Sequence, residues 1–111
     1  MTPPVIRRAT IDDPSAVLAL YRELHPSEHA AADAGDVFAH IVNTTGLSIL
    51  LLEVDAAPVA TTHLNVIPNL TRGAAPYAVI DNVVVAQRWR GQGLGKRIMA
   101  ATLKKSGTPA L

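Results

Sequence analysis

An apolar strand that runs directly into a glycine-rich turn, and then into an amphipathic helix, is the strongest constraint on the fold of this chain. The strand covers residues 77–85, glycines follow at Gly91, Gly93 and Gly95, and the helix begins at about Gly93. Alternating glycines let the main chain approach an anion closely, and a helix start offers unpaired N–H groups and a positive dipole end. The segment therefore predicts a site for a phosphate or pyrophosphate group.

Two common classes of phosphate site share this order of strand, turn and helix, and the sequence fits neither. A P-loop requires Gly-x-x-x-x-Gly-Lys followed by Ser or Thr, whereas Arg97 follows Lys96 here. A Rossmann dinucleotide site requires Gly-x-Gly-x-x-Gly and an acidic residue about 20 positions further on. Here the spacing is Gly-x-Gly-x-Gly, and no Asp or Glu follows Asp81.

The pattern that remains is Arg90-x-x-Gly93-x-Gly95 after an apolar strand. It resembles the acyl-CoA pyrophosphate loop of the GNAT superfamily of N-acetyltransferases, in which Arg or Gln is followed by x-x-Gly-x and then Gly or Ala. The resemblance covers nearly the whole chain, because the expected elements follow the order of that family.

The expected order is β-α-α-β-β-β-α, in a single domain over residues 1–111. The expected fold class is α/β, of the α+β kind with a mixed sheet. Asp13 before Pro14 predicts an N-cap and the first turn of the first helix. The strand over residues 77–85 lacks alternation, which predicts burial on both faces. The other expected elements are strands over residues 5–9, 47–54 and 58–67, a second helix over about 33–44, a loop over 68–76, and a last helix that buries Leu94, Ile98, Ala101 and Thr102.

The end of the chain departs from the family pattern. The resemblance implies a further strand, a helix and a closing hairpin after the pyrophosphate-loop helix, and residues 104–111 contain none of these. In the family the helix after this further strand often carries a tyrosine that protonates the leaving thiolate. We therefore expect a partial acetyltransferase domain, truncated after the pyrophosphate-loop helix.

Composition limits the classes of partner that this chain is expected to bind. With 49% hydrophobic residues and a net charge of +1, the chain is unlike disordered proteins and strongly basic nucleic-acid binders. It has no cysteine, no apolar run long enough to span a membrane and no secretion signal, so we expect a cytoplasmic protein without membrane or nucleic-acid partners. Six of the ten basic residues gather around the predicted phosphate site: Arg88, Arg90, Lys96, Arg97, Lys104 and Lys105.

The resemblance implies acetyl-CoA as the acyl donor. Main-chain N–H groups of the loop would bind the pyrophosphate, and the main chain of the preceding strand would hold the pantetheine arm and the thioester oxygen. The residues expected to bind acetyl-CoA are Val83, Val84, Val85, Arg88, Arg90, Gly91, Gln92, Gly93, Leu94, Gly95 and Lys96.

Asp81 is the expected catalytic residue. An amine with a pKa near about 10.4 is mostly protonated at neutral pH, so a carboxylate should help to remove its proton. Asp81 interrupts an apolar strand, where aspartate is disfavoured, and family members often carry a glutamate there. The alternative is that Asp81 faces solvent or caps a turn.

Asn69, Arg72 and His29 are expected to border the amine acceptor. Asn69 and Arg72 lie in a loop between strands, next to the cleft that we expect at the end of the strand over residues 77–85. His29 lies in the loop between the first two helices, which the resemblance places at the acceptor site. Arg72 could equally be a solvated loop charge. The motif His25-Pro-Ser-Glu-His29 resembles a zinc-peptidase motif, but Pro26 interrupts the helix that such a motif needs, so no metal is expected.

These features together predict an N-acetyltransferase that moves acetyl from acetyl-CoA to a primary amine by direct attack, without a covalent enzyme intermediate. One alternative is a catalytically weak acyl-CoA-binding module. Another is an interaction protein, or a homodimer, that pairs through an exposed edge of the strand over residues 77–85.

Overall fold

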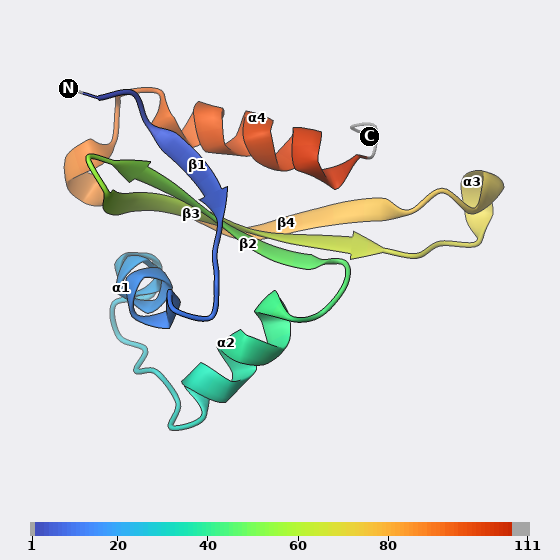
Figure 1. Cartoon of the computed structure of the whole chain (residues 1–111), viewed down its shortest axis with the longest axis horizontal. Helices are drawn as coiled ribbons and strands as arrows, with labels where there is room; N and C mark the ends of the chain where they lie inside the picture. Colours follow the sequence, from blue (N-terminus) through green and yellow to red (C-terminus); the bar gives the residue numbers. More distant parts are fainter. Residues whose placement is uncertain (1, 108–111) are drawn as a thin grey trace.

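The structure is a computed structural model that describes residues 2–107, and its centre is an antiparallel sheet (Figure 1). The described strands lie in the order β1-β2-β3-β4, and each pairs antiparallel with the next. The strands are β1 (Val5–Arg8), β2 (Leu47–Val54), β3 (Ala57–Ile67) and β4 (Tyr77–Val85). The predicted element order is confirmed.

Helices cover both faces of the sheet. α1 (Pro14–Leu24) and α2 (Ala34–Val42) lie on one face, and α4 (Leu94–Ser106) lies on the other (Figure 1). A short helix, α3 (Thr71–Ala74), and a 3-10 turn, η1 (Gln87–Trp89), lie at opposite ends of β4.

Each face of the sheet has its own apolar core, because successive side chains of a strand point to opposite faces. On the α1/α2 face the core comprises Ala9, Val17, Leu20, Phe38, Ile49, Leu51, Val84 and Ala86. On the α4 face it comprises Leu50, Leu52, Val54, Val59, Ala60, Leu94 and Ile98. The last helix thus buries Leu94, Ile98 and Thr102 as predicted, whereas Ala101 is only half-buried.

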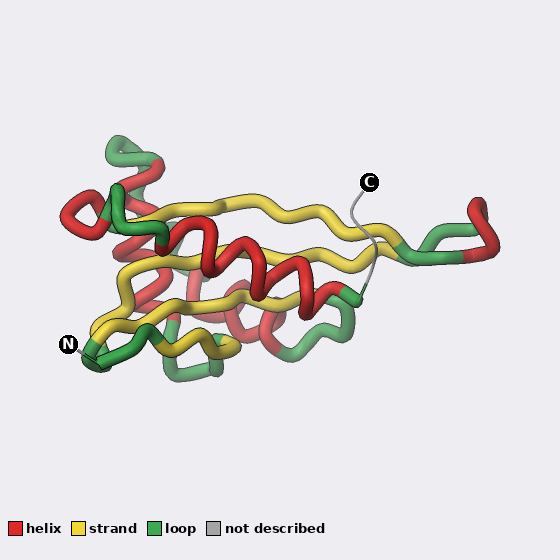
Figure 2. The backbone as a smooth tube through the Cα atoms, turned by 90° about the horizontal axis from the view of Figure 1, so that it is seen from above, coloured by secondary structure: helices red, strands yellow, loops and turns green. Residues whose placement is uncertain are grey.

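The prediction that β4 is buried on both faces is wrong. Its side chains alternate between exposed and partly buried along most of the strand, and Tyr77, Val79 and Val83 are exposed. In the described part of the chain β4 is an edge strand, and its half nearest α3 extends past the covering helices (Figures 1 and 2). Pairing of this edge with a second copy of the chain stays a prediction.

Two local features also differ from expectation. Residues 68–76, expected as a plain loop, contain the single turn α3, in which Arg72 and Ala74 have positive φ. Asp13 is the N-cap residue of α1, but its side chain makes no capping bond. The carboxylate accepts instead from the Thr10 N–H at 2.7 Å and from both terminal nitrogens of the Arg7 guanidinium at 2.8 and 2.9 Å.

The last residues of the tail, 108–111, lie outside the described residues, as does residue 1. Between these limits none of the helices combines the length and the hydropathy needed to cross a bilayer.

Candidate functional site

The glycine turn after β4 is held by main-chain bonds and by left-handed glycines. The Ala86 N–H donates to the Val59 carbonyl at 2.8 Å, which ends the β3–β4 ladder, and η1 then turns the chain. Gly91 and Gly93 have φ of 80° and 78°, values that favour glycine. Gly93 is the N-cap of α4, and its carbonyl accepts from the Arg97 N–H at 3.2 Å. The glycines therefore set the start of α4.

A row of main-chain N–H groups at this helix start is unpaired. No hydrogen bond within residues 2–107 is donated by the N–H of Gln92, Gly93, Leu94, Gly95 or Lys96. The Leu94 side chain is buried in the α4-face core, so Leu94 offers the site only its main chain. A Cβ at Gly95 would lie 3.6 Å from Val85 Cγ2, an ordinary contact. This end of the helix can accept an anion.

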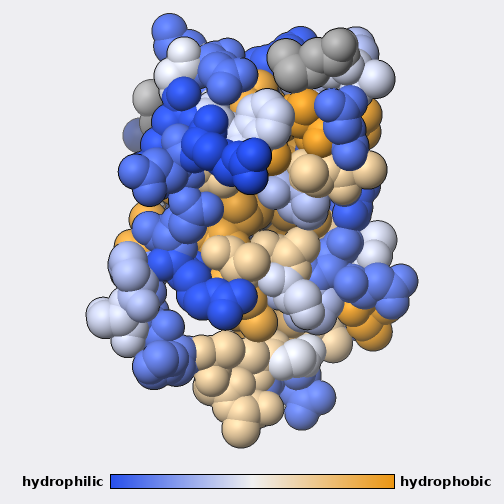
Figure 3. All heavy atoms as spheres, turned by 90° about the vertical axis from the view of Figure 1, so that its left-hand side faces the viewer, coloured by the Kyte–Doolittle hydropathy of each residue, from blue (hydrophilic) through white to orange (hydrophobic). Residues whose placement is uncertain are grey.

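Exposed cations surround the turn. Arg88, Arg90 and Lys96 are exposed, and none of them is in an ion pair with another described residue. Arg90 Nε donates to the Val85 carbonyl at 2.9 Å, which holds the arginine against the end of β4. Figure 3 shows this end of the molecule, where hydrophilic side chains flank an apolar centre. The charge of the site complements a polyanion.

The three consecutive valines at the end of β4, Val83 to Val85, occupy different environments. Antiparallel strands bond at alternate residues, so the Ala86–Val59 bond places the main chain of Val84 toward β3 and that of Val85 toward the open edge. The Val84 side chain is buried in the α1/α2-face core, and the Val83 side chain is exposed. Of the three, Val85 therefore has the main-chain N–H best placed for a ligand, while its carbonyl accepts from Arg90.

A β-bulge interrupts β4 just before these valines. Between the pairs Thr61–Val84 and His63–Asp81, β3 has one residue and β4 has two. One of the two, Asn82, has a φ of 50°, in the left-handed region that asparagine tolerates better than most residues. Bulges occur often beside active sites, where they redirect side chains.

Asp81 lies on β4 directly opposite His63 on β3. Its side chain is 55% exposed and that of His63 15%, and 3.6 Å separates His63 Nδ1 from Asp81 Oδ1. His63 follows Thr61 by two positions and pairs with Ile49, so this pair faces α1 and α2. Sequence reasoning assigned no partner to His63, because the strand register that joins it to Asp81 depends on the bulge.

Tyr21 of α1 approaches the same region. Its hydroxyl is buried and makes no well-formed hydrogen bond among residues 2–107, although the Asn82 side chain lies close enough to act on it. Burial raises the pKa of Tyr21, the Asp81 carboxylate adds to this shift, and the Asn82 side chain opposes it. The face of β4 toward α1 thus gathers an acid, an imidazole and a phenol.

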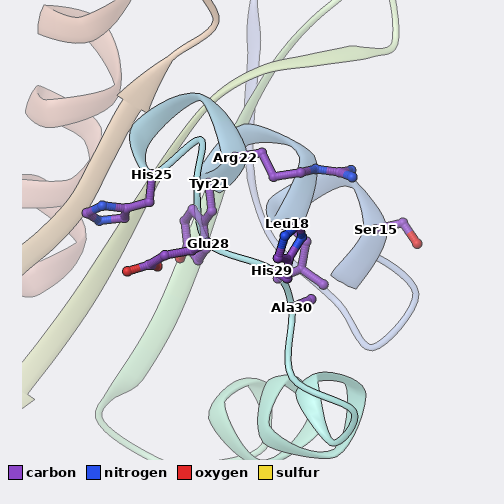
Figure 4. A pocket seen from close by; sticks show the side chains of 8 residues that line it. All are labelled: Ser15, Leu18, Tyr21, Arg22, His25, Glu28, His29 and Ala30. Carbon is purple, nitrogen blue, oxygen red and sulfur yellow. The ribbon is translucent and has the colours of Figure 1, made fainter.

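The expected acceptor residues fall into two groups. His29 lines a pocket of about 320 Å³ formed by α1 and the loop after it, whereas the loop that contains Asn69 and Arg72 lies at the far end of the β3–β4 hairpin (Figures 1 and 4). In Figure 4 His25 and Glu28 extend to one side of this pocket, and Arg22 and Ser15 to the other. Asn69 and Arg72 therefore lie away from the pocket that His29 lines, whereas all three were expected to border the acceptor.

Comparison with protein families gives a match over most of the chain. The family model described as "Acetyltransferase (GNAT) family" matches residues 15–108. A comparison with curated protein sequences gave no significant match.

Solved structures of acetyltransferases resemble this fold closely. A protein from Agrobacterium tumefaciens with a provisional acetyltransferase assignment has 38% sequence identity and a TM-score of 0.87, and the match covers 92% of this chain and 72% of that one. Glucosamine-6-phosphate N-acetyltransferase from Arabidopsis thaliana has 22% identity and a TM-score of 0.80, with 93% and 74% covered. The second likeness concerns the fold alone.

The family model covers most of the chain, and the structure has the expected order of elements, with a turn of unpaired main-chain N–H groups after β4. This chain belongs to the GNAT family of acetyltransferases.

Proposed function

We propose that this chain transfers an acetyl group from acetyl-CoA to a primary amine by direct attack. The observation that carries the proposal is the row of unpaired N–H groups from Gln92 to Lys96, next to cations that have no ion-pair partner among the described residues. Five successive unpaired main-chain donors at a helix start, with positive charge around them, suit a pyrophosphate.

The residues of the turn would contribute to acetyl-CoA binding in different ways. Gly91 and Gly93 keep the main chain free of side chains where the phosphates would approach, and the exposed Arg88 and Lys96 add charge. Arg90 is held at the Val85 carbonyl, so its charge is fixed at the junction of strand and turn. The outward main chain of Val85 would hold the pantetheine arm, and the predicted contributions of Val83 and Val84 are weaker because of the bulge and the β3 pairing.

Asp81 is proposed to take the proton that the ammonium group must lose before it can attack. When bound, the thioester supplies the carbonyl carbon, and the amine nitrogen forms a bond to it as the C–S bond breaks and CoA leaves as the thiolate. The proton that the nitrogen then loses balances the proton that the thiolate takes up, so the products are the amide and free CoA thiol. The half-exposed Asp81 carboxylate lies three residues before Val84, on the face of β4 that α1 covers in part. A carboxylate in this position can accept the proton directly or through one water molecule.

The acceptor is proposed to approach along α1, where His29 lines the pocket beside Tyr21. Asn69 and Arg72 lie beyond the start of β4, and Tyr77 is already four residues, or about 13 Å, from Asp81. These two side chains would therefore contact only an extended acceptor, such as a peptide.

The binding test compares two variants that differ by one charge. Gly95 has helical geometry and space for a Cβ, and an acidic residue in the first turn favours a helix, so both Gly95→Asp and Gly95→Asn should fold. Isothermal titration of acetyl-CoA should show binding to the wild type, and binding to Gly95→Asp about tenfold or more weaker than to Gly95→Asn. Equal affinities of the two variants would contradict the proposed pyrophosphate site.

The activity test measures release of free thiol from acetyl-CoA with a panel of primary amines. Asp81→Asn should lower kcat by about 10²-fold or more, with little change in the affinity for acetyl-CoA. Binding of acetyl-CoA without turnover on any amine would contradict the acetyl transfer and leave only a binding module.

A further inference from the structure

His63 has an arrangement that the core does not explain. It is a largely buried imidazole in a strand, and the Asp81 carboxylate lies 3.6 Å from Nδ1, a charge contact slightly longer than a hydrogen bond. Its other ring nitrogen, Nε2, is buried and has no hydrogen-bond partner in the part of the chain that the structure describes. Buried polar atoms without partners are uncommon in proteins and often mark functional positions.

The two ring nitrogens of His63 have different surroundings, and these surroundings determine which nitrogen carries the proton. A carboxylate accepts hydrogen bonds, so the nitrogen beside Asp81 is the better place for an N–H. A proton on Nε2 would instead create a buried donor with no acceptor, which is unfavourable. A proton on Nδ1 therefore faces the carboxylate, and Nε2 is left as a buried acceptor without a described partner.

Asp81 in turn has no other partner that could hold it. None of the hydrogen bonds and ion pairs among residues 2–107 involves its carboxylate, apart from the contact with His63. The side chain is half-exposed and would otherwise turn freely about its side-chain torsions. A general base must keep its oxygen within reach of the proton that it removes.

We propose that His63, with a proton on Nδ1, is a positioning residue that directs the Asp81 carboxylate toward the acceptor amine. The inference rests on the proposed role of Asp81 in the acetyl transfer. A proton relay through the ring does not fit, because Nε2 is buried with no described group to receive the proton.

The first test observes the ring directly and does not require activity. Nitrogen-15 NMR of the histidine side chains distinguishes a proton on Nδ1 from a proton on Nε2. With His63 assigned by comparison with His63→Asn, the wild type should show the Nδ1–H form, and Asp81→Ala, which removes the acceptor, should shift the ring toward Nε2–H. An Nε2–H ring in the wild type, or a spectrum that does not respond to Asp81→Ala, would overturn the proposal.

The second test uses the shapes of the two amides. The amide nitrogen of Asn lies near the place of Nδ1 in a histidine, and that of Gln lies near Nε2. His63→Asn should keep kcat within about threefold of the wild type, whereas His63→Gln and His63→Leu should lower kcat by about tenfold without changing KM for acetyl-CoA. A uniform loss in all three variants, or better activity of Gln than of Asn, would overturn the positioning role.

The two tests separate the inference from the function on which it rests. If the wild type acetylates no amine, the proposed function fails, and the NMR measurement still decides whether His63 donates to Asp81. If the wild type is active and His63→Asn loses all rate, thermal unfolding midpoints matched to the wild type would count against positioning, since the Nδ1 donor is retained.

Discussion

The two faces of the sheet differ in how completely their buried polar groups are paired. On the α4 face the buried Thr62 hydroxyl lies 2.8 Å from the Thr102 hydroxyl, which donates to the Ile98 carbonyl at 2.6 Å. On the α1/α2 face the buried Thr61 hydroxyl donates to the Leu50 carbonyl at 2.7 Å, but the Tyr21 hydroxyl and His63 Nε2 are buried without well-formed hydrogen bonds among the described residues. Buried polar groups without partners lower stability, so selection for folding alone should remove them. The α4 face therefore has the features of a structural core, and the α1/α2 face those of a site.

The largest effect expected from this contrast is on the α4 face. Ile98 is fully buried and packs in the α4-face core, so Ile98→Ala should lower the free energy of unfolding by about 2–5 kcal/mol. Chemical denaturation followed by circular dichroism measures it. The exposed Leu103 on the same helix provides the control, because Leu103→Ala should cost less than about 1 kcal/mol. Equal costs would mean that the packing of α4 is not as described.

A smaller effect is expected where the α1/α2 face is anchored to β1. The Arg7 guanidinium lowers the pKa of the Asp13 carboxyl, mainly through their hydrogen bonds, and the side chain of Asp13 is 13% exposed. Because Arg7 is partly exposed, we expect Asp13→Asn to cost only about 1–3 kcal/mol of unfolding free energy at neutral pH.

The sign of the pH dependence follows from the lowered pKa of Asp13. Its contribution is present above the unfolded-state pKa of about 3.9 and is lost as the pH falls through the lower folded-state value. The difference between the wild type and Asp13→Asn should therefore shrink below about pH 4, as measured by urea unfolding at several pH values. Asp12→Asn is the control, because Asp12 is exposed and outside the ion pairs of the described residues.

The smallest effect should have the opposite sign. Tyr21→Phe removes a buried hydroxyl that has no described partner, so stability should stay unchanged or rise by up to about 1 kcal/mol. Thr102→Val is the matched change on the α4 face, and it should cost about 1–3 kcal/mol because it leaves the Thr62 hydroxyl without its bond. Thermal unfolding measures both. A destabilising Tyr21→Phe would show that the hydroxyl is satisfied in solution and would remove the contrast between the faces.

The sequence was sufficient to predict the element order and most boundaries. Apolar periodicity places the last helix and its buried Ile98, and proline after Asp13 marks the start of α1. Long-range contacts decide what the pattern leaves open. Asp13 has the residue type and position of a cap, yet Arg7, six residues earlier, takes its carboxylate. The apolar run in β4 suggests a central strand, but edge position and alternation appear only once the strands are paired.

The site was predictable to different degrees. The glycine turn has local causes, namely left-handed glycines and a helix start, and its residues lie together as expected. Asp81 was predicted from an acid in an apolar strand. His63 and Tyr21 could not be linked to it, since one is joined by cross-strand register and the other by packing of α1 on the sheet.

The bulge at Asn82 places Asp81 and Val84 on the same face of β4, which a regular strand would not do. Side chains of a strand alternate, so two residues three positions apart normally face opposite ways. Asp81 and Val84 are three apart, yet they pair with His63 and Thr61, which share a face. The extra residue reverses the parity of the strand. Deleting Asn82 would keep every chemical group of the site and turn either the carboxylate or the start of the glycine turn to the wrong side.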